Sequence, residues 1–191
     1  MLEYLGIVVL QSFWLMLPCY VSNSSAVLVG GGKPVDFGRN FFDNKRIFGD
    51  GKTWLGLIGG IVIGMGVGSA QIISLSIAKI YNYHSDFIPE FGSNSNFIVV
   101  LFCLCFGAMF GDLLKSFVKR RLGIERGKKL IILDQLDFVL GAWLFLTIFA
   151  RNWFFSYFHL PHIIFILLVT PLLHRVVNII GYKLGKKKVP W

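Results

Sequence analysis

The chain has 191 residues, of which 55% are hydrophobic and only 15% are charged, and its mean hydropathy is +0.67. A typical soluble domain is about 25% charged, so this composition argues against a soluble enzyme and a disordered chain and predicts an integral membrane protein. The net charge of +9 indicates loops that face anionic lipid, and only secondarily a phosphate-bearing partner, so we expect membrane lipids and no nucleic acid as partners.

Five apolar stretches are long enough to cross a bilayer, where a helix needs about 20 apolar residues. They predict an all-α, polytopic membrane protein with one domain over residues 1–191 and spans at about 4–21, 54–78, 97–117, 136–152 and 159–180. In the second stretch, Gly60, Gly64 and Gly68 have a spacing that lets two helices pack closely. In the fifth, Pro161 and Pro171 are expected kink sites.

The basic residues alternate between successive loops. The loop at residues 23–53 holds five Lys and Arg, the loop at residues 118–135 holds six, and the tail Lys183–Lys188 holds four. The second loop, at residues 81–96, has none, and the fourth loop has only Arg151, at the end of the fourth span. The positive-inside rule therefore predicts that the N-terminus lies outside, and that loops 23–53 and 118–135 and the C-terminus lie in the cytosol. We expect a multi-pass protein of the cell membrane whose active site faces the cytosol.

Three acidic residues lie at or near the ends of the predicted loop 118–135. Asp112 lies near the end of the third span, and Asp134 and Asp137 are three residues apart at the start of the fourth, so they share a helix face. A short loop predicts antiparallel neighbours, which would bring the three carboxylates to one depth, where they suit a hard cation such as Mg²⁺. Two alternatives stay open: Asp134 or Asp137 caps a helix, and Asp112 forms a salt bridge with Lys115 or Lys119.

The loop at residues 23–53 contains both glycines and basic residues. Gly31 and Gly32 allow backbone N–H groups to approach a phosphate, and Lys or Arg can neutralise it. The run Gly51-Lys52-Thr53 resembles the end of a Walker A motif, but Arg46 stands where that motif needs glycine, so we reject a P-loop. A flexible connector has no need of the four aromatic residues of this loop, Phe37, Phe41, Phe42 and Phe48.

Other polar residues within or beside the apolar stretches carry weaker signals. Arg175 lies inside the fifth stretch and either receives a lipid phosphate or extends to the interface. We interpret the histidines His159 and His162 as interfacial residues, and the three cysteines as apolar packing residues.

Three blocks, in order along the chain, resemble one family. The block GGGKPVDFGRNFFDNKRIFGDGKTWLG at residues 30–56, preceded by Pro18, Tyr20 and Asn23, resembles the signature of archaeal CDP-archaeol synthases and departs from it at Leu55. The blocks FGDLLKSFVKRRLGIERG, residues 110–127, and LDQLDF, residues 133–138, are similar to the same family and to CDP-diacylglycerol synthases.

The resemblance implies five spans and a cytidylyltransferase that transfers CMP from CTP to a lipid phosphate, with Mg²⁺, forming CDP-archaeol and pyrophosphate. The implied acceptor is unsaturated archaetidic acid, with phosphatidic acid as the alternative. An inactive relative also stays open. A small transporter or channel is the alternative of another class, which the absence of internal repeats disfavours.

The expected roles divide the candidate residues into three groups. Asp112, Asp134 and Asp137 hold the metal and act in catalysis together with Lys119 and Arg120. CTP and its phosphates contact Gly31, Gly32, Lys33, Asp36, Arg39, Asp50, Lys52, Thr53 and Ser116. Arg175 is the candidate for the lipid phosphate.

Overall fold

The computed structural model describes residues 2–82, 87–92, 96–124, 133–183 and 185. Over these residues the protein is helical and contains no β-strand, which confirms the predicted all-α class. The helices are α1 (Leu2–Val29), α2 (Trp54–Ile80), α3 (Asn96–Arg121), α4 (Leu133–Phe149), α5 (Arg151–Tyr157) and α6 (Leu160–Lys183). Seven charged residues of the predicted third loop and of the tail lie outside the described residues, namely Glu125, Arg126, Lys128, Lys129 and Lys186–Lys188.

Helix α1 continues well past the predicted end of the first span at residue 21. The hydroxyl groups of Ser24 and Ser25 donate to the backbone oxygens of Tyr20 and Val21 at 2.8 and 2.7 Å. These local hydrogen bonds satisfy the hydroxyls, so polar residues remain inside the helix. The loop that we predicted at residues 23–53 is therefore shorter and begins at residue 30.

Helix α4 ends at Phe149 instead of residue 152, and the next residues form the separate short helix α5, which we did not predict. The chain leaves helical geometry at Ala150 (φ −137°, ψ 40°), where the apolar run meets Arg151 and Asn152. Among the described helices, α1, α2, α3 and α6 are long and apolar enough to cross a membrane, whereas α4 has 17 residues. The protein is thus a multi-pass helical membrane protein, and the count of five spans stays a prediction.

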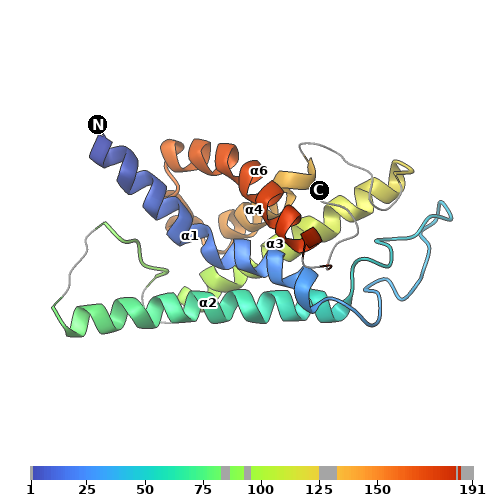
Figure 1. Ribbon diagram of the computed structural model, residues 1–191, viewed down its shortest axis with the longest axis horizontal. Coiled ribbons are helices and arrows are strands. Elements are labelled where there is room, and N and C mark those ends of the chain that lie inside the picture. The colour runs from blue at the N-terminus through green and yellow to red at the C-terminus, as the bar shows by residue number, and fades with distance from the viewer. Residues whose placement is uncertain (1, 83–86, 93–95, 125–132, 184, 186–191) are drawn as a thin grey trace.

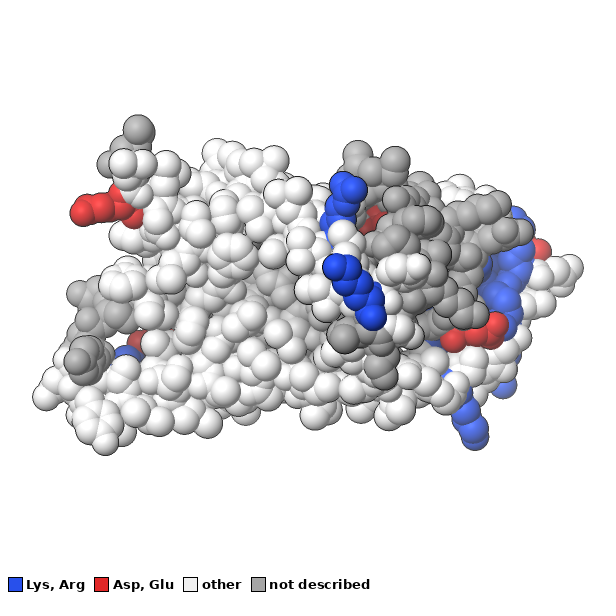
Figure 2. Space-filling model, in the orientation of Figure 1, with Lys and Arg blue, Asp and Glu red and all other residues white. Residues whose placement is uncertain are grey.

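The long helices form one elongated bundle (Figure 1). The C-terminal ends of α1 and α3 and the N-terminal ends of α2 and α4 point toward the same end, beside loop 30–53. On the face drawn in Figure 2, Lys and Arg gather at this end, others stand closer to the middle, and the zone between these and the far end shows almost no charged side chain. We call this region the charged end and define it as loop 30–53, residues 112–121 of α3 and residues 134–137 of α4.

Glycines let α1 and α2 approach each other, as predicted. A Cβ atom added at Gly60 would lie 2.8 Å from the backbone oxygen of Ser22, and one at Gly64 would lie 2.7 Å from that of Pro18. Gly68 is also buried, but it faces the side chain of Leu101 on α3. The spacing of these three glycines therefore marks the packed face of α2.

A second glycine contact, between α3 and α4, positions the charged end. A Cβ added at Gly107 would lie 2.7 Å from the Cα atom of Ala142, and one at Gly111 would overlap the backbone oxygen of Asp137. Gly141 faces back onto Gly107 and Gly111. Because no side chain separates the two backbones, the residues that follow Gly111 on α3 lie directly against the start of α4.

Candidate functional site

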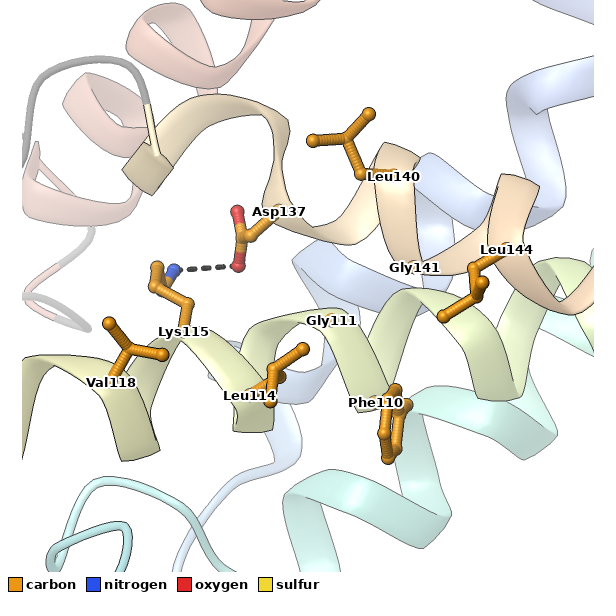
Figure 3. A pocket seen from close by; sticks show the side chains of 9 residues that line it. All are labelled: Phe110, Gly111, Leu114, Lys115, Val118, Asp137, Leu140, Gly141 and Leu144. Carbon is orange, nitrogen blue, oxygen red and sulfur yellow. Dashed lines mark ion pairs between the residues drawn. The ribbon is translucent and has the colours of Figure 1, made fainter.

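The centre of the charged end is a chain of ion pairs between α3, α4 and loop 30–53. The Nζ atom of Lys115 lies 3.0 Å from Oδ1 of Asp112 and 2.9 Å from Oδ2 of Asp137. Lys52, from the end of the loop, pairs with the other carboxylate oxygen of Asp112. The side chains of Asp112 and Asp137 are only 12% and 4% exposed. The structure therefore brings two of the three predicted carboxylates onto one shared ammonium group. Figure 3 shows the half of this arrangement that joins Lys115 and Asp137.

Asp134 lies one turn before Asp137 and makes a separate pair. Both of its carboxylate oxygens accept hydrogen bonds from Nζ of Lys119 at 3.0 Å. Among the described residues, no group of three His, Cys, Asp or Glu side chains is close enough to hold a metal ion. The salt bridge that we left open for Asp112 is thus present, with Lys115 as partner. Asp134 occupies the first turn of α4, as the capping alternative expects.

Asp137 nevertheless fits a divalent cation. Within the described part of the chain, its buried Oδ1 atom meets no hydrogen-bond donor, which is costly for a carboxylate oxygen. Asp112 and Asp137 together offer hard oxygen donors of the kind that Mg²⁺ binds through one or two carboxylates. These residues therefore fit a divalent cation that takes the place of the Lys115 ammonium group.

Asp36 organises the loop from within. Its side chain is fully buried, and Arg46 Nη2 donates to Oδ1 at 2.7 Å. The backbone N–H of Gly38 also donates to Oδ1, and those of Phe48 and Gly49 donate to Oδ2 at 3.0 and 2.9 Å. Burial acts to raise the pKa of Asp36, but the guanidinium and the backbone N–H groups outweigh it and hold that pKa well below its usual range. Asp36 thus shapes the loop and is not available to contact a ligand.

The lowered pKa of Asp36 predicts how the loop responds to acid. A carboxylate with a depressed pKa stabilises the fold at any pH above its unfolded value, about 3.9, and this stabilisation is lost as pH falls toward the native pKa. We expect the amides of Phe48 and Gly49 to stay protected from hydrogen exchange between pH 7 and about 4, and to lose protection below it. Asp36→Asn should lose this protection already at pH 7, whereas Asp50→Asn, at an exposed carboxylate, should keep most of it.

Thr53 connects the glycines to α2. Its hydroxyl oxygen caps the helix by accepting the N–H of Gly56 at 3.2 Å, and it also accepts the N–H of Gly31 at 3.1 Å. Gly31 and Gly32 have φ values of +149° and +71°, which glycine adopts without strain. Both glycines are exposed, as are the predicted phosphate contacts Lys33 and Arg39.

The loop docks on the last turn of α3 through Arg121. Its guanidinium donates to Asp43 Oδ1 and to the backbone oxygen of Arg46, both at 2.6 Å. The same group lies 4.8 and 5.0 Å from the ring centroids of Phe41 and Phe117. These contacts explain part of the aromatic content of the loop and exclude a flexible connector.

The remaining predicted residues are spread over the charged end and α6. Arg120 lies beside Gly49, and its buried Nε atom has no hydrogen-bond partner among the described residues. Ser116 is buried, and its hydroxyl donates to the backbone oxygen of Asp112 at 3.0 Å. Asp50 is exposed and pairs with Arg46 at 2.6 Å. Arg175 is exposed on α6, so both interpretations of this residue stay open.

Three residues that organise this site were not predicted from the sequence, namely Lys115, Arg46 and Arg121. The spacing of three residues from Asp112 to Lys115 places both on one helix face and indicates a salt bridge, but it does not indicate that Lys115 also reaches Asp137. The partners of Arg121 are 75 to 78 residues away in the sequence, so no local pattern could identify them. Cys19, Cys103 and Cys105 are buried free cysteines, which confirms their packing role.

An apolar groove of about 210 Å³ begins at the Lys115–Asp137 pair and continues along the outer side of α3 and α4 (Figure 3). Gly111 and Gly141 line it where the two helices touch. Its other lining residues include Leu114, Leu140 and Leu144, whose side chains are about half exposed. The groove therefore joins the apolar flank of the bundle to the charged end.

The fold and this site together define a helical membrane protein in which an apolar groove meets a cluster of cations and carboxylates. The family of CarS-like CDP-archaeol synthases matches residues 4–191. The CDP-archaeol synthase of Methanospirillum hungatei is 48% identical to this chain, and the match covers 92% of this chain and 100% of that protein. The CDP-archaeol synthase of Archaeoglobus fulgidus is 44% identical, and the match covers 96% of this chain and 98% of that protein.

A solved structure, described as an intramembrane enzyme for archaeal membrane lipids biosynthesis, superposes on the chain with a TM-score of 0.67. It is 32% identical in sequence, and the match covers 89% of this chain and 94% of that one. The chain belongs to the CDP-archaeol synthase family, which confirms the resemblance and the cytidylyltransferase class that it implied. Enzymes of this class generally use a divalent metal ion.

Proposed function

We propose that this protein transfers CMP from CTP to unsaturated archaetidic acid, forming CDP-archaeol and pyrophosphate, with Mg²⁺ as the metal ion. One observation carries the proposal: an apolar groove leads to two buried carboxylates that pair with Lys52 and Lys115. A lipid phosphate needs an apolar path for its chains, and a nucleoside triphosphate needs cations. Both requirements meet at the charged end.

The reaction needs positioning and charge neutralisation more than proton transfer. An oxygen of the lipid phosphate attacks the α-phosphorus of CTP and forms the new P–O bond. The bond from that phosphorus to the bridging oxygen breaks, and pyrophosphate leaves with the electron pair. Because the attacking phosphate is already ionised, no strong general base is required, and catalysis follows from holding the two anions in line.

The cations of the charged end suit this task. Lys52, whose backbone N–H donates to the backbone oxygen of Gly49, and Arg120 lie beside the loop turn at Gly49, and we assign them to the triphosphate. Lys119 adds a further basic side chain on α3, and Lys33 and Arg39 add basic side chains from the exposed part of the loop. When bound, a divalent cation held by Asp112 and Asp137 would neutralise further charge on the triphosphate. We place Asp134 as the carboxylate that orients Lys119 at the edge of this cation site.

The distribution of charge also supports an orientation. The basic loop 30–53 and the basic last turn of α3 lie at the same end of the bundle. By the positive-inside rule this end faces the cytosol, where CTP is available. We propose five spans, with α4 as the shorter fourth span between α3 and α6.

The test is a CMP-transfer assay with purified protein in lipid vesicles. We expect labelled CTP, Mg²⁺ and unsaturated archaetidic acid to yield a labelled CDP-lipid and one pyrophosphate per turnover. EDTA should stop the reaction, and added Mg²⁺ should restore it. Turnover of phosphatidic acid alone would assign the acyl acceptor instead. Solute flux without any CTP turnover would refute the proposal and favour a transporter.

A further inference from the structure

Lys115 lies at the junction of two environments. Its ammonium group is 3.0 and 2.9 Å from the carboxylates of Asp112 and Asp137, and its side chain is 15% exposed. The same residue lines the apolar groove, where it is the one basic residue among the lining side chains described. Figure 3 shows Lys115 pointing from α3 toward Asp137 on α4, with the leucines of the groove beside it. It can therefore reach both the carboxylates and anything that enters the groove.

The present partners of Lys115 are also the best oxygen donors for a divalent cation. Two buried carboxylates this close repel each other unless positive charge lies between them, and here the ammonium group supplies that charge. An ammonium group and a divalent cation cannot occupy the same carboxylate oxygens. Binding of the metal must therefore release Lys115, and its flexible four-carbon side chain allows the ammonium group to move.

The groove offers Lys115 a new partner once it is released. A free ammonium group beside apolar walls is poorly solvated, so it strongly favours an incoming anion. A lipid phosphate whose chains lie along Leu114, Leu140 and Leu144 would bring its head group to this end of the groove. We infer that Lys115 is a placeholder cation, which neutralises Asp112 and Asp137 until the divalent cation binds and then holds the phosphate of the lipid acceptor in the groove. This inference rests on the proposed function and adds a residue and an order of events to it.

The first test measures metal binding in the absence of both substrates. Mn²⁺ serves as the probe, and the loss of its free electron paramagnetic resonance signal reports binding to purified protein. Lys115→Met removes the competing ammonium group, so we expect Mn²⁺ to bind about tenfold more tightly than to the wild type. The double variant K115M/D137N should lose this gain. An Mn²⁺ affinity of K115M that is equal to or weaker than that of the wild type overturns the inference.

The second test separates the two substrates by steady-state kinetics. We expect K115M to raise KM for the lipid phosphate about tenfold and to change KM for CTP less than twofold, because Lys115 meets the acceptor and not the nucleotide. An equal rise in both KM values, or a fall in kcat alone, contradicts the second half of the inference. Lys79→Met is the matched control, because Lys79 also forms an ion pair, with Glu90, at the opposite end of the bundle.

Two precautions keep the result interpretable. If K115M gives no folded protein, Lys115→Gln replaces it, because a neutral amide still donates to both carboxylates without competing as a cation. The Mn²⁺ measurement needs neither CTP nor lipid. A wild type that makes no CDP-lipid would therefore refute the proposed function, while the placeholder role would still be decided by the Mn²⁺ affinities.

Discussion

Replacing Asp137 by Asn is expected to lower the rate of CMP transfer by about a thousandfold while the protein remains folded. Asp137 is buried, its Oδ1 has no donor among the described residues, and it faces the same ammonium group as Asp112. An amide keeps the shape of the side chain but removes the charge that would hold a cation on the triphosphate. Losses of 10² to 10³ are typical when one group that stabilises transition-state charge is removed.

The measurement is kcat at saturating CTP, with folding checked by the thermal transition in detergent. Asp112→Asn should give a similar loss. Asp134→Asn should cost only about tenfold, because Asp134 is paired with Lys119 at the edge of the site. Glu90→Gln at the opposite end is the control and should keep full activity. A D137N variant that retains more than a tenth of the wild-type rate would remove Asp137 from the cation site.

The second large effect is expected at Gly111. Replacing it by Val puts a side chain where the backbone oxygen of Asp137 already lies, so α3 and α4 must separate. Overpacking of this kind typically costs 1–3 kcal/mol, and more where the obstacle is backbone. We expect the thermal transition to fall by about 5 °C or more, and CMP transfer to be lost because Asp112 and Asp137 no longer face each other.

Gly66→Val is the matched control for Gly111→Val. Both glycines lie in apolar helices, but a Cβ at Gly66 would meet nothing within 4 Å. This variant should therefore keep the wild-type transition temperature and activity. The comparison between the two variants separates close packing from the general effect of a β-branched residue in a membrane helix. A Gly111→Val variant as stable as Gly66→Val would contradict the close contact of α3 and α4.

The elements of the fold were largely predictable because apolar runs of about 20 residues have one common outcome in a bilayer. The ends of the helices were less predictable, because local hydrogen bonds of polar side chains determine where a helix stops. Ser24 and Ser25 stay in α1 through hydrogen bonds to the preceding turn. The break at Ala150 coincides with the polar residues Arg151 and Asn152, but hydropathy does not indicate that the separate helix α5 begins there. The glycines of α2 were readable from their spacing, and the pair Gly107 and Gly111 has the same spacing on α3.

The residues of the candidate site were predictable by type but not by partner. The carboxylates Asp112 and Asp137 were expected to meet, and the structure brings them together across the glycine contact. Lys115 lies between these carboxylates, and Asp134 pairs with Lys119 instead. Both results depend on how α3 and α4 are rotated about their axes. A sequence without a structure does not specify this rotation. We expected Asp36 to contact CTP, but every hydrogen bond that its carboxylate accepts comes from the side chain or backbone of the same loop.

The docking of loop 30–53 on Arg121 has a consequence for biosynthesis. The ribosome adds the residues of this loop that contact Arg121, from Asp43 to Arg46, 75 to 78 residues before it adds Arg121 itself. At 5–20 residues per second this delay is about 4 to 15 seconds. During that time Asp43, Phe41 and the backbone of Arg46 have no α3 to contact. The contacts of the loop with Arg121 can therefore form only after α3 has been synthesised, so in a partly made chain the loop lacks its anchor on this helix.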